Sequence, residues 1–309
     1  MNRHGDKSDS QHPVTYHLMQ NIVLIRRALL TIIAGVAIQA CSSSVAAADR
    51  DYMSAGEVAL TSGGTVALGL FGTYVKKVDS TDSKLIRGPL PLERRLQETL
   101  GGRYEPGKSY FLDNTRGSII TPAMSALVLG GANLTWPQEK AGKDVTQDMF
   151  LFVTGLAATK GLTDLVKGTV GRPRPLVSLQ PDLAALRKET DYSYDHQSFF
   201  SGHTSGAFFA VTFLNKRLRT ILRQRSSIQT YRNWRWAPPT LLFGWGAVVA
   251  WSRVHAYKHF PSDVLAGAIA GALMAELFYS FGNDIVRDGS KAGSAQAASS
   301  YLLRVNIKF

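Results

Sequence analysis

The 309-residue sequence contains one cysteine and is short of acidic residues. A single cysteine, Cys41, excludes a disulfide framework and a cysteine-rich metal site. Lysine and arginine number 35 against 23 aspartate and glutamate residues, which gives a formal net charge of +12. This excess favours anionic partners such as phosphate esters, acidic lipid surfaces or nucleic acid. The sequence has no zinc-ligand pattern, aromatic ribonucleoprotein-type motif or continuous basic recognition helix, so we expect no nucleic-acid partner.

Long apolar runs free of charge are also scarce, although 45% of the residues are hydrophobic and 19% are charged. A membrane-spanning helix needs about 20 predominantly apolar residues. Several apolar segments fall short of this length, and Lys160, Asp164 and Lys167 interrupt one of them. We expect membrane association, while the number of spans stays open and a soluble or peripheral domain is the alternative.

Six apolar segments rich in alanine, glycine and leucine follow one another along the chain. They lack the alternation of β-branched residues that is typical of strands, so each predicts a helix. We expect an all-α fold, a helical bundle of about six core helices with the active site at helix ends. The predicted helices cover residues 58–75, 118–136, 149–166, 205–214, 238–251 and 264–281.

Polar segments separate and follow these helices. "GPLPLERRLQETLGG" (residues 88–102) predicts a short amphipathic helix that ends at Gly101, whereas residues 176–198 form a long loop of mixed charge. After the flexible "GSKAGSAQAASS", the final "YLLRVNIKF" alternates apolar and polar residues and predicts a short extended tail. We expect a targeting segment (1–48), a helical domain (49–284), and a linker with an extended C-terminal tail (285–309).

The N-terminal region has the layout of a secretory signal. Arg26 and Arg27 precede a short apolar run, and small residues follow it. Signal-peptidase cleavage after Ala48 and lipidation at Cys41 are two possible fates of this segment. The third possibility is an N-terminal helix that stays uncleaved. Export places the protein in a bacterial cell envelope, in the periplasm or in the inner membrane with a periplasm-facing site.

A second signal for orientation conflicts with the first. Residues 215–236 hold seven lysines and arginines and no acidic residue, a composition that the positive-inside rule places in the cytoplasm. Counting spans from an exported N-terminus places the same link outside. Either one apolar segment does not span the membrane, or none does.

The first cluster with chemical potential is "KGTVGRPRP", just past the end of a predicted helix. Its prolines stiffen the backbone, so Arg172 and Arg174 project from a non-helical segment close to Lys167. These cations suit phosphate oxygens, but a solvated basic helix end is an equally good explanation. Arg172 fits either an outer contact or a solvated surface charge.

The second cluster is Ser201-Gly202-His203, ahead of a helix that we expect to begin near Thr204 or Ser205. The free N–H groups and positive dipole end of such a helix attract anions. Glycine lets the backbone come close to a bound oxyanion. The alternative is an ordinary serine N-cap beside a half-buried histidine.

The third cluster is "SRVHAYKHFPSD". Pro261 suits the first helical position, which puts Asp263 in the first turn. From there its carboxylate can reach back to His259, fix the ring tautomer and leave the other nitrogen free. Beside Arg253, such an imidazole is a good nucleophile or base. His255 lacks a partner at this spacing, so we expect it at the surface or outside the direct contacts.

In this order the clusters resemble the three-part signature of the type 2 phosphatidic acid phosphatase superfamily, which also includes bacterial class A acid phosphatases and vanadium haloperoxidases. The resemblance covers about residues 167–273, a third of the chain. Phe200 stands where many members have proline, and an aromatic residue there is more similar to the lipid phosphate phosphatase branch. The matching pattern is Lys167-x6-Arg174-Pro175, Ser201-Gly202-His203 and Ser252-Arg253-x5-His259-x3-Asp263.

The resemblance implies a metal-independent phosphatase that hydrolyses phosphate monoesters, with lipid phosphates or isoprenyl pyrophosphates as substrates. His259, oriented by Asp263, would form a phosphohistidine, and His203 would act as general acid, without a metal or other cofactor. The implied phosphate-binding residues are Lys167, Arg174, Ser201, Gly202 and Arg253.

Three alternatives stay open at this level. A soluble periplasmic non-specific acid phosphatase would take small esters, and a vanadate-dependent haloperoxidase would use the same anion site. The third is a non-catalytic binder of lipid headgroups, although anion binding alone does not need an oriented neutral imidazole. Lys160 and Asp164, one helical turn apart, predict a structural ion pair.

Overall fold

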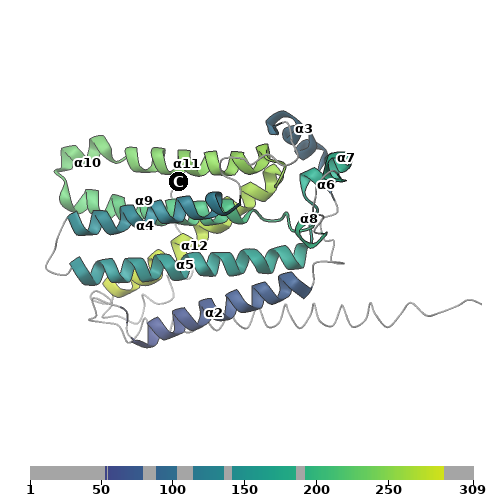
Figure 1. Ribbon diagram of the computed structural model, residues 1–309. Helices are drawn as coiled ribbons and strands as arrows, with labels where there is room; N and C mark the ends of the chain where they lie inside the picture. Colours follow the sequence, from purple (N-terminus) through teal and green to yellow (C-terminus); the bar gives the residue numbers. More distant parts are fainter. Residues whose placement is uncertain are drawn as a thin grey trace, which may run out of the picture. The chain divides into compact units, whose positions relative to one another are not determined.

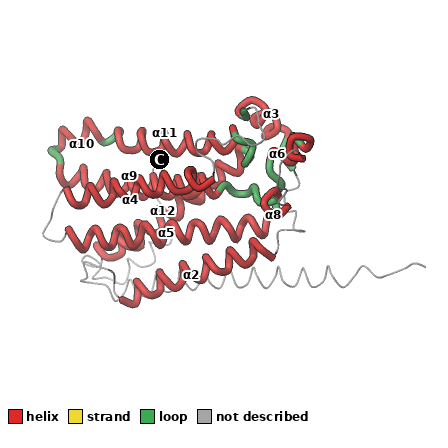
Figure 2. The backbone as a smooth tube through the Cα atoms, in the orientation of Figure 1, coloured by secondary structure: helices red, strands yellow, loops and turns green. Residues whose placement is uncertain are grey.

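The computed structural model describes residues 53, 55–78, 88–102, 114–135, 141–185 and 192–288 (Figure 1). These residues fall in one compact unit of residues 50–287, with Asp288 as the last helical residue. The predicted targeting segment, Cys41 and the predicted C-terminal tail lie outside the described residues. Within the described ranges the chain forms helices joined by loops and turns, with no strand (Figure 2), which confirms the predicted all-α fold.

Six long helices occupy the described part of the chain, and each overlaps one of the predicted apolar segments. Most extend beyond the prediction because polar residues in their terminal turns carry no hydrophobic pattern. They are α2 (Ala55–Val78), α4 (Asn114–Thr135), α5 (Ala141–Val170), α9 (Gly202–Arg225), α11 (Ala237–His255) and α12 (Pro261–Asp288).

Shorter helices lie between them. The amphipathic prediction is confirmed by α3 (Pro91–Leu100), which has Gly101 as its C-cap. The predicted loop at 176–198 instead contains α6 (Pro175–Leu179), α7 (Pro181–Ala185) and α8 (Tyr192–Asp195). Helices α6 and α7 both begin at a proline, whose fixed φ suits the first helical position. The link between α9 and α11 carries α10 (Ile228–Trp234).

Aromatic side chains from α5, α9 and α12 form the centre of the core. The Phe152 ring lies 5.8 Å from Phe209 and 5.6 Å from Phe213, and Tyr279 meets Phe213 edge-on at 5.4 Å. Leu129 of α4 is fully buried in the same cluster. Helix α5 packs against α2, α4 and α9, and α9 packs against α4 and α11. Burial of these rings holds the long helices side by side.

Small residues let some helices approach closely. A Cβ on Gly271 of α12 would lie 2.1 Å from the Ser205 carbonyl oxygen of α9. A Cβ on Gly72 of α2 would lie 2.2 Å from the carbonyl oxygen of Gly161 in α5. Contacts this short require glycine, and close crossings at small residues are typical of helices that associate in membranes.

Large apolar side chains also face outward from the bundle. Leu70, Leu127, Leu241 and Leu265 are between 63% and 72% exposed, on α2, α4, α11 and α12. By length and composition alone, three described segments could cross a membrane. These segments are Ala55–Lys77, Thr146–Leu179 and Pro261–Ser280.

We expect Gly271→Ala to lower the free energy of unfolding by about 1–3 kcal/mol, because its new methyl group overlaps the Ser205 carbonyl. Gly244→Ala in α11, where a Cβ meets nothing within 4 Å, is the control. That substitution should be neutral or stabilising by about 0.5–1 kcal/mol. Thermal unfolding of the purified variants measures both, and equal melting temperatures would contradict the close α9–α12 contact.

Candidate active site

The ends of four long helices bring the three sequence clusters together. Lys167 lies in the last turn of α5 and Arg253 in the last turn of α11. Gly202 opens α9, and Asp263 lies in the first turn of α12. In Figures 1 and 2 these ends gather with α3, α6 and α8 at one end of the helices. The predicted placement of a site at helix ends follows from this antiparallel arrangement.

Ser201 is the N-cap of α9. Its Oγ accepts hydrogen bonds from the Thr204 N–H at 3.4 Å and from the Thr204 hydroxyl at 2.9 Å. The helix therefore begins at Gly202, two or three residues earlier than predicted. The Ser201 N–H donates to the Asp263 carbonyl oxygen at 3.0 Å, which ties the start of α9 to the start of α12. The predicted N-cap reading and the anion-binding reading both suit this geometry, because the cap still leaves N–H groups of the first turn facing outward.

Gly202 lies close to the cation of the first cluster. A Cβ at this position would be 3.7 Å from Lys167 Nζ and 3.2 Å from a Thr163 methyl group. The first turn of α9 therefore faces the Lys167 ammonium group across a narrow gap. Backbone N–H groups and an ammonium group on facing sides are suited to holding phosphate oxygens.

His259 is almost fully buried and held by a backbone carbonyl. Its Nδ1 lies 2.7 Å from the Ser198 carbonyl oxygen. A carbonyl oxygen can only accept, so Nδ1 carries the proton and the Nε2 lone pair is free to react. Asp263 Oδ2 lies 3.9 Å from Nδ1, beyond hydrogen-bond distance. The sequence predicted a direct carboxylate–imidazole contact, whereas the structure places the Ser198 carbonyl in that role.

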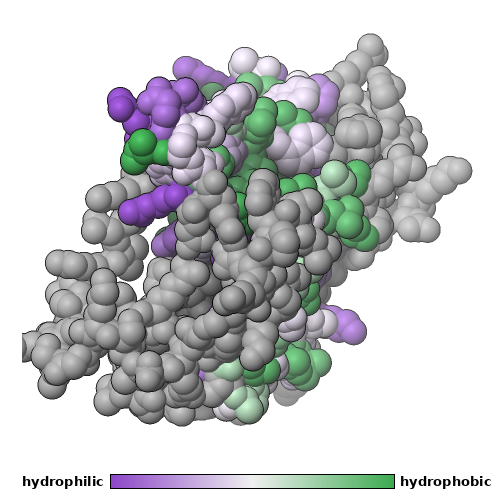
Figure 3. All heavy atoms as spheres, turned by 90° about the vertical axis from the view of Figure 1, so that its left-hand side faces the viewer, coloured by the Kyte–Doolittle hydropathy of each residue, from purple (hydrophilic) through white to green (hydrophobic). Residues whose placement is uncertain are grey.

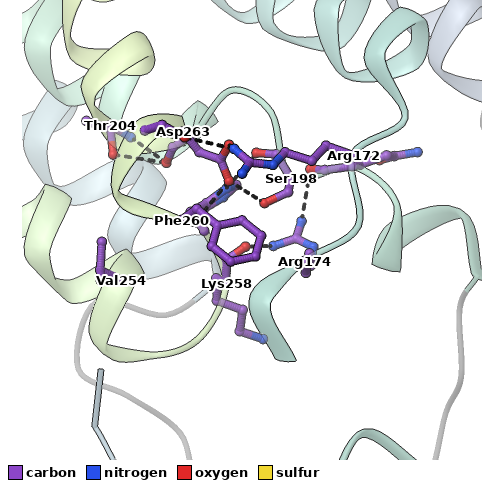
Figure 4. Close-up of polar contacts among 12 residues, drawn as sticks. Arg172, Arg174, Ser198, Thr204, Val254, Lys258, Phe260 and Asp263 are labelled. Carbon is purple, nitrogen blue, oxygen red and sulfur yellow. Dashed lines mark hydrogen bonds and ion pairs between the residues drawn. The ribbon is translucent and has the colours of Figure 1, made fainter. Parts of the chain in front are cut away.

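The Asp263 carboxylate is fully buried and receives three other hydrogen bonds (Figure 4). The Ser198 hydroxyl donates to Oδ2 at 2.5 Å, and the Phe260 N–H donates to the same oxygen at 2.9 Å. Arg172 Nη1 donates to Oδ1 at 2.6 Å. Asp263 thus holds Ser198 through its hydroxyl, and the carbonyl of the same residue holds His259.

The electrostatic surroundings keep His259 neutral. Burial, followed by the positive charges of Arg174, Lys167 and His203, lowers the pKa of His259 well below its usual value of 6.5. The hydrogen bond to Ser198 acts in the opposite direction and is outweighed. An imidazole with these neighbours keeps its lone pair at neutral and mildly acidic pH.

Arg174 is buried, and its side chain joins its own segment to the segments that contain Tyr194 and Lys258. Its guanidinium donates to the carbonyl oxygens of Tyr194 and Lys258, both at 2.9 Å, and lies 3.8 Å from the centre of the Tyr194 ring. These contacts fix the position of the Arg174 guanidinium, and its positive charge therefore stays beside His259. Arg253 is also buried, and its carbonyl oxygen accepts from the N–H groups of Lys258 and His259.

Of two predictions for the region of the first cluster, one is wrong and one is confirmed. Arg172 is 2% exposed, so its interpretation as a solvated surface charge is wrong. It reaches Asp263 and, with Nη2, Glu93 Oε2 at 2.7 Å. The predicted ion pair of Lys160 and Asp164 is confirmed, and Lys76 of α2 joins it at 3.2 Å.

Ser198 and Glu93 were not singled out from the sequence. Ser198 acts partly through its backbone carbonyl, which has no side-chain signature. Glu93 is the third residue of an amphipathic helix and looked like part of a solvated face.

Phe200 is buried and its ring contacts Phe199 at 6.1 Å, so it packs inside the fold. Within the described residues, no group of three or more His, Cys, Asp or Glu side chains is placed to hold a metal ion.

Comparison with known proteins agrees with this geometry. Residues 148–287, which contain all three clusters, match the family model of the PAP2 superfamily. This part of the chain belongs to the PAP2 superfamily. This PAP2 segment, residues 148–287, begins in α5 and ends near the last turn of α12. It therefore includes every helix end that supplies a predicted site residue.

Relatives of the chain include mammalian enzymes. Human phospholipid phosphatase 2 is 31% identical over 157 residues, 44% of this chain and 51% of the relative. Phospholipid phosphatase 1 of Mus musculus is 31% identical over 156 residues, 44% of this chain and 52% of the relative. The chain thus spans about half the length of these curated relatives.

Two crystal structures are similar to the chain. LpxE of Aquifex aeolicus is 20% identical with a TM-score of 0.36, over 61% of this chain and 95% of that one. The transmembrane PAP2 type phosphatidylglycerolphosphate phosphatase of Bacillus subtilis is 17% identical with a TM-score of 0.39, over 70% and 94%.

The lowered pKa of His259 predicts the shape of a pH profile. If His259 is the nucleophile, only its neutral imidazole reacts, and kcat/KM should stay high as the pH falls until it reaches the pKa of His259, which lies well below 6.5. Lys167→Gln removes one of the charges that lower this pKa, so the acidic limb should move to higher pH by roughly one unit. The substrate's own ionisation is common to both proteins and cancels. An unshifted limb in K167Q would contradict the electrostatic coupling of Lys167 and His259.

Proposed function

We propose that this chain is a phosphatase that hydrolyses phosphate monoesters of lipids through a phosphohistidine at His259. The observation that carries the proposal is the oriented neutral imidazole of His259, with its Nδ1–H on the Ser198 carbonyl, beside the positive charges of Arg174 and Lys167. A site that only binds anions gains from a charged imidazolium and has no use for a free lone pair.

In the first step, the Nε2 lone pair of His259 attacks phosphorus and the P–O bond to the leaving group breaks. The electron pair goes to the leaving oxygen, which takes a proton from His203. The imidazole becomes positively charged as the P–N bond forms. The buried Asp263 carboxylate, 3.9 Å from Nδ1, and the Ser198 carbonyl both stabilise that charge.

In the second step, water attacks phosphorus and gives its proton to His203. The P–N bond breaks, its electron pair returns to Nε2, and inorganic phosphate leaves. Lys167, Arg174 and Arg253, with the first-turn N–H groups of α9, offset the charge on the equatorial oxygens in both steps.

A lipid substrate is favoured by the outer surface of the bundle and by the relatives. Exposed leucines on α2, α4, α11 and α12 would be costly in water and suit lipid chains. The mammalian relatives of the chain are named phospholipid phosphatases. The lipid chains of a substrate would stay in the bilayer while its phosphate reaches the helix ends.

The bundle also supplies an orientation. Helix α9 runs away from the site, and α11 returns to it, so α10 lies at the opposite end (Figure 1). Trp234 and Trp236 at this end are 61% and 66% exposed, and Arg235 lies 5.1 Å from the Trp236 ring. Figure 3, which views this end, shows hydrophilic side chains gathered beside apolar ones. Basic residues with exposed tryptophans are typical of a cytoplasmic membrane interface.

We therefore place the site on the non-cytoplasmic side, which is the periplasm in a bacterial envelope. The basic residues around α10 support this orientation, because K/R bias in short loops favours the cytoplasmic side. With the link in the cytoplasm, α9 and α11 both lead to a site on the other side.

Cysteine labelling tests the orientation. In a Cys41→Ser background, Asp182→Cys in α7 at the site end should react with a membrane-impermeant thiol reagent added to sealed cells. Ser227→Cys, exposed beside α10, should react only after the cells are opened. Reaction of Ser227→Cys in sealed cells with protection of Asp182→Cys would reverse the orientation.

Substitution of the nucleophile tests the chemistry. His259→Ala should lower phosphate release from phosphatidic acid and p-nitrophenyl phosphate by roughly 10³-fold or more, because it removes the group that forms the covalent intermediate. His255→Ala, whose ring lies 4.8 Å from the Trp251 ring, is the matched control and should stay active. Acid-labile 32P on the wild-type protein and its loss in His259→Ala would identify the phosphohistidine. Wild-type turnover in His259→Ala would overturn the mechanism.

A further inference from the structure

Glu93 connects a distant helix to the histidine through buried contacts. It belongs to α3, outside the three clusters, and is 6% exposed. Its Oε2 accepts from Arg172 Nη2 at 2.7 Å and from the Leu90 N–H at 2.8 Å. Its Oε1 accepts from the Ser262 hydroxyl. Burial alone would raise the pKa of Glu93, but these hydrogen bonds and the Arg172 charge outweigh it and lower the pKa.

Arg172 divides its guanidinium between two carboxylates. Nη2 binds Glu93, while Nη1 binds Asp263 Oδ1 at 2.6 Å and the Ser262 hydroxyl at 2.8 Å. Its guanidinium lies 4.4 Å from the centre of the Phe260 ring. An arginine facing a single carboxylate favours two parallel hydrogen bonds to both oxygens. Here it makes one to each acid.

This division leaves Asp263 Oδ2 available for Ser198. With Arg172 held by Glu93, Oδ2 accepts from the Ser198 hydroxyl at 2.5 Å. The carbonyl of the same serine accepts from His259 Nδ1 at 2.7 Å. Loss of the Glu93 charge would let Arg172 turn toward both oxygens of Asp263 and compete with Ser198 for Oδ2.

We propose that Glu93 is a positioning residue for His259, acting through Arg172, Asp263 and Ser198. The inference rests on the proposed phosphohistidine chemistry. Glu93 touches neither substrate nor the reacting atoms. It orients the imidazole that must align with phosphorus, so its removal should slow the chemical step more than it weakens substrate binding.

The main test is Glu93→Gln, which keeps the size of the side chain and removes its charge. We expect kcat to fall about tenfold, with KM changed less than about twofold, because a misaligned nucleophile slows chemistry without removing binding groups. The rate of 32P-phosphohistidine formation should fall by the same factor. Glu98→Gln, an exposed position on the same helix, is the matched control and should leave kcat unchanged.

A double-mutant cycle separates positioning from a general structural effect. If Glu93 acts through Ser198, then Glu93→Gln should change kcat less than about twofold in a Ser198→Ala background. Effects that multiply in the double variant, or a wild-type kcat in Glu93→Gln, would overturn the inference. Should Glu93→Gln not fold, Ser262→Ala decides, because it removes contacts of both Glu93 and Arg172. An unchanged kcat in Ser262→Ala overturns the inference as well.

Failure of the proposed function has a different signature. A wild-type protein that forms no phosphohistidine and releases no phosphate would contradict the phosphatase proposal and this inference together. An active wild-type protein with an equally active Glu93→Gln would contradict this inference alone.

Discussion

A guanidinium group stays charged at every accessible pH. A buried arginine therefore destabilises the fold by several kcal/mol unless carboxylates pair with it. Arg172 meets this constraint with Glu93 from α3 and Asp263 from α12. These contacts join a short surface helix, the segment after α5 and the start of the last helix. Asp263 then binds Ser198, and the Ser198 carbonyl binds His259. The orientation of the His259 ring thus depends on which carboxylates pair with the buried Arg172.

The bundle converts this local network into a site. Its aromatic core and its glycine crossings set the long helices side by side, which brings their ends together. A helix N-terminus contributes free N–H groups, and the neighbouring helix ends contribute cations. Burial strengthens these interactions because little water screens them. The same burial, with Arg174 and Lys167 nearby, lowers the pKa of His259 and keeps its imidazole neutral.

Much of the fold was predictable, and so were several of the residues that meet at the helix ends. Apolar segments rich in alanine and leucine placed all six long helices, and Pro261 correctly marked the start of α12. The motif spacing selected His259, Asp263 and Lys167. The contacts that use backbone carbonyls were not predictable. Every residue has a backbone carbonyl, and the sequence does not indicate which group each one binds. Arg172 and Glu93 were misplaced or overlooked since a polar residue on a short helix usually faces water.

The sequence by itself determined which side chains take part, because residue types and their spacing within a helix or turn are local properties. It also determined the helical class, through the composition of the apolar segments. Only the tertiary structure decided how those side chains act. The partners of Arg172 lie 79 and 91 residues away, and that of His259 lies 61 residues away. Distances of this kind are set by helix packing, which no local pattern encodes.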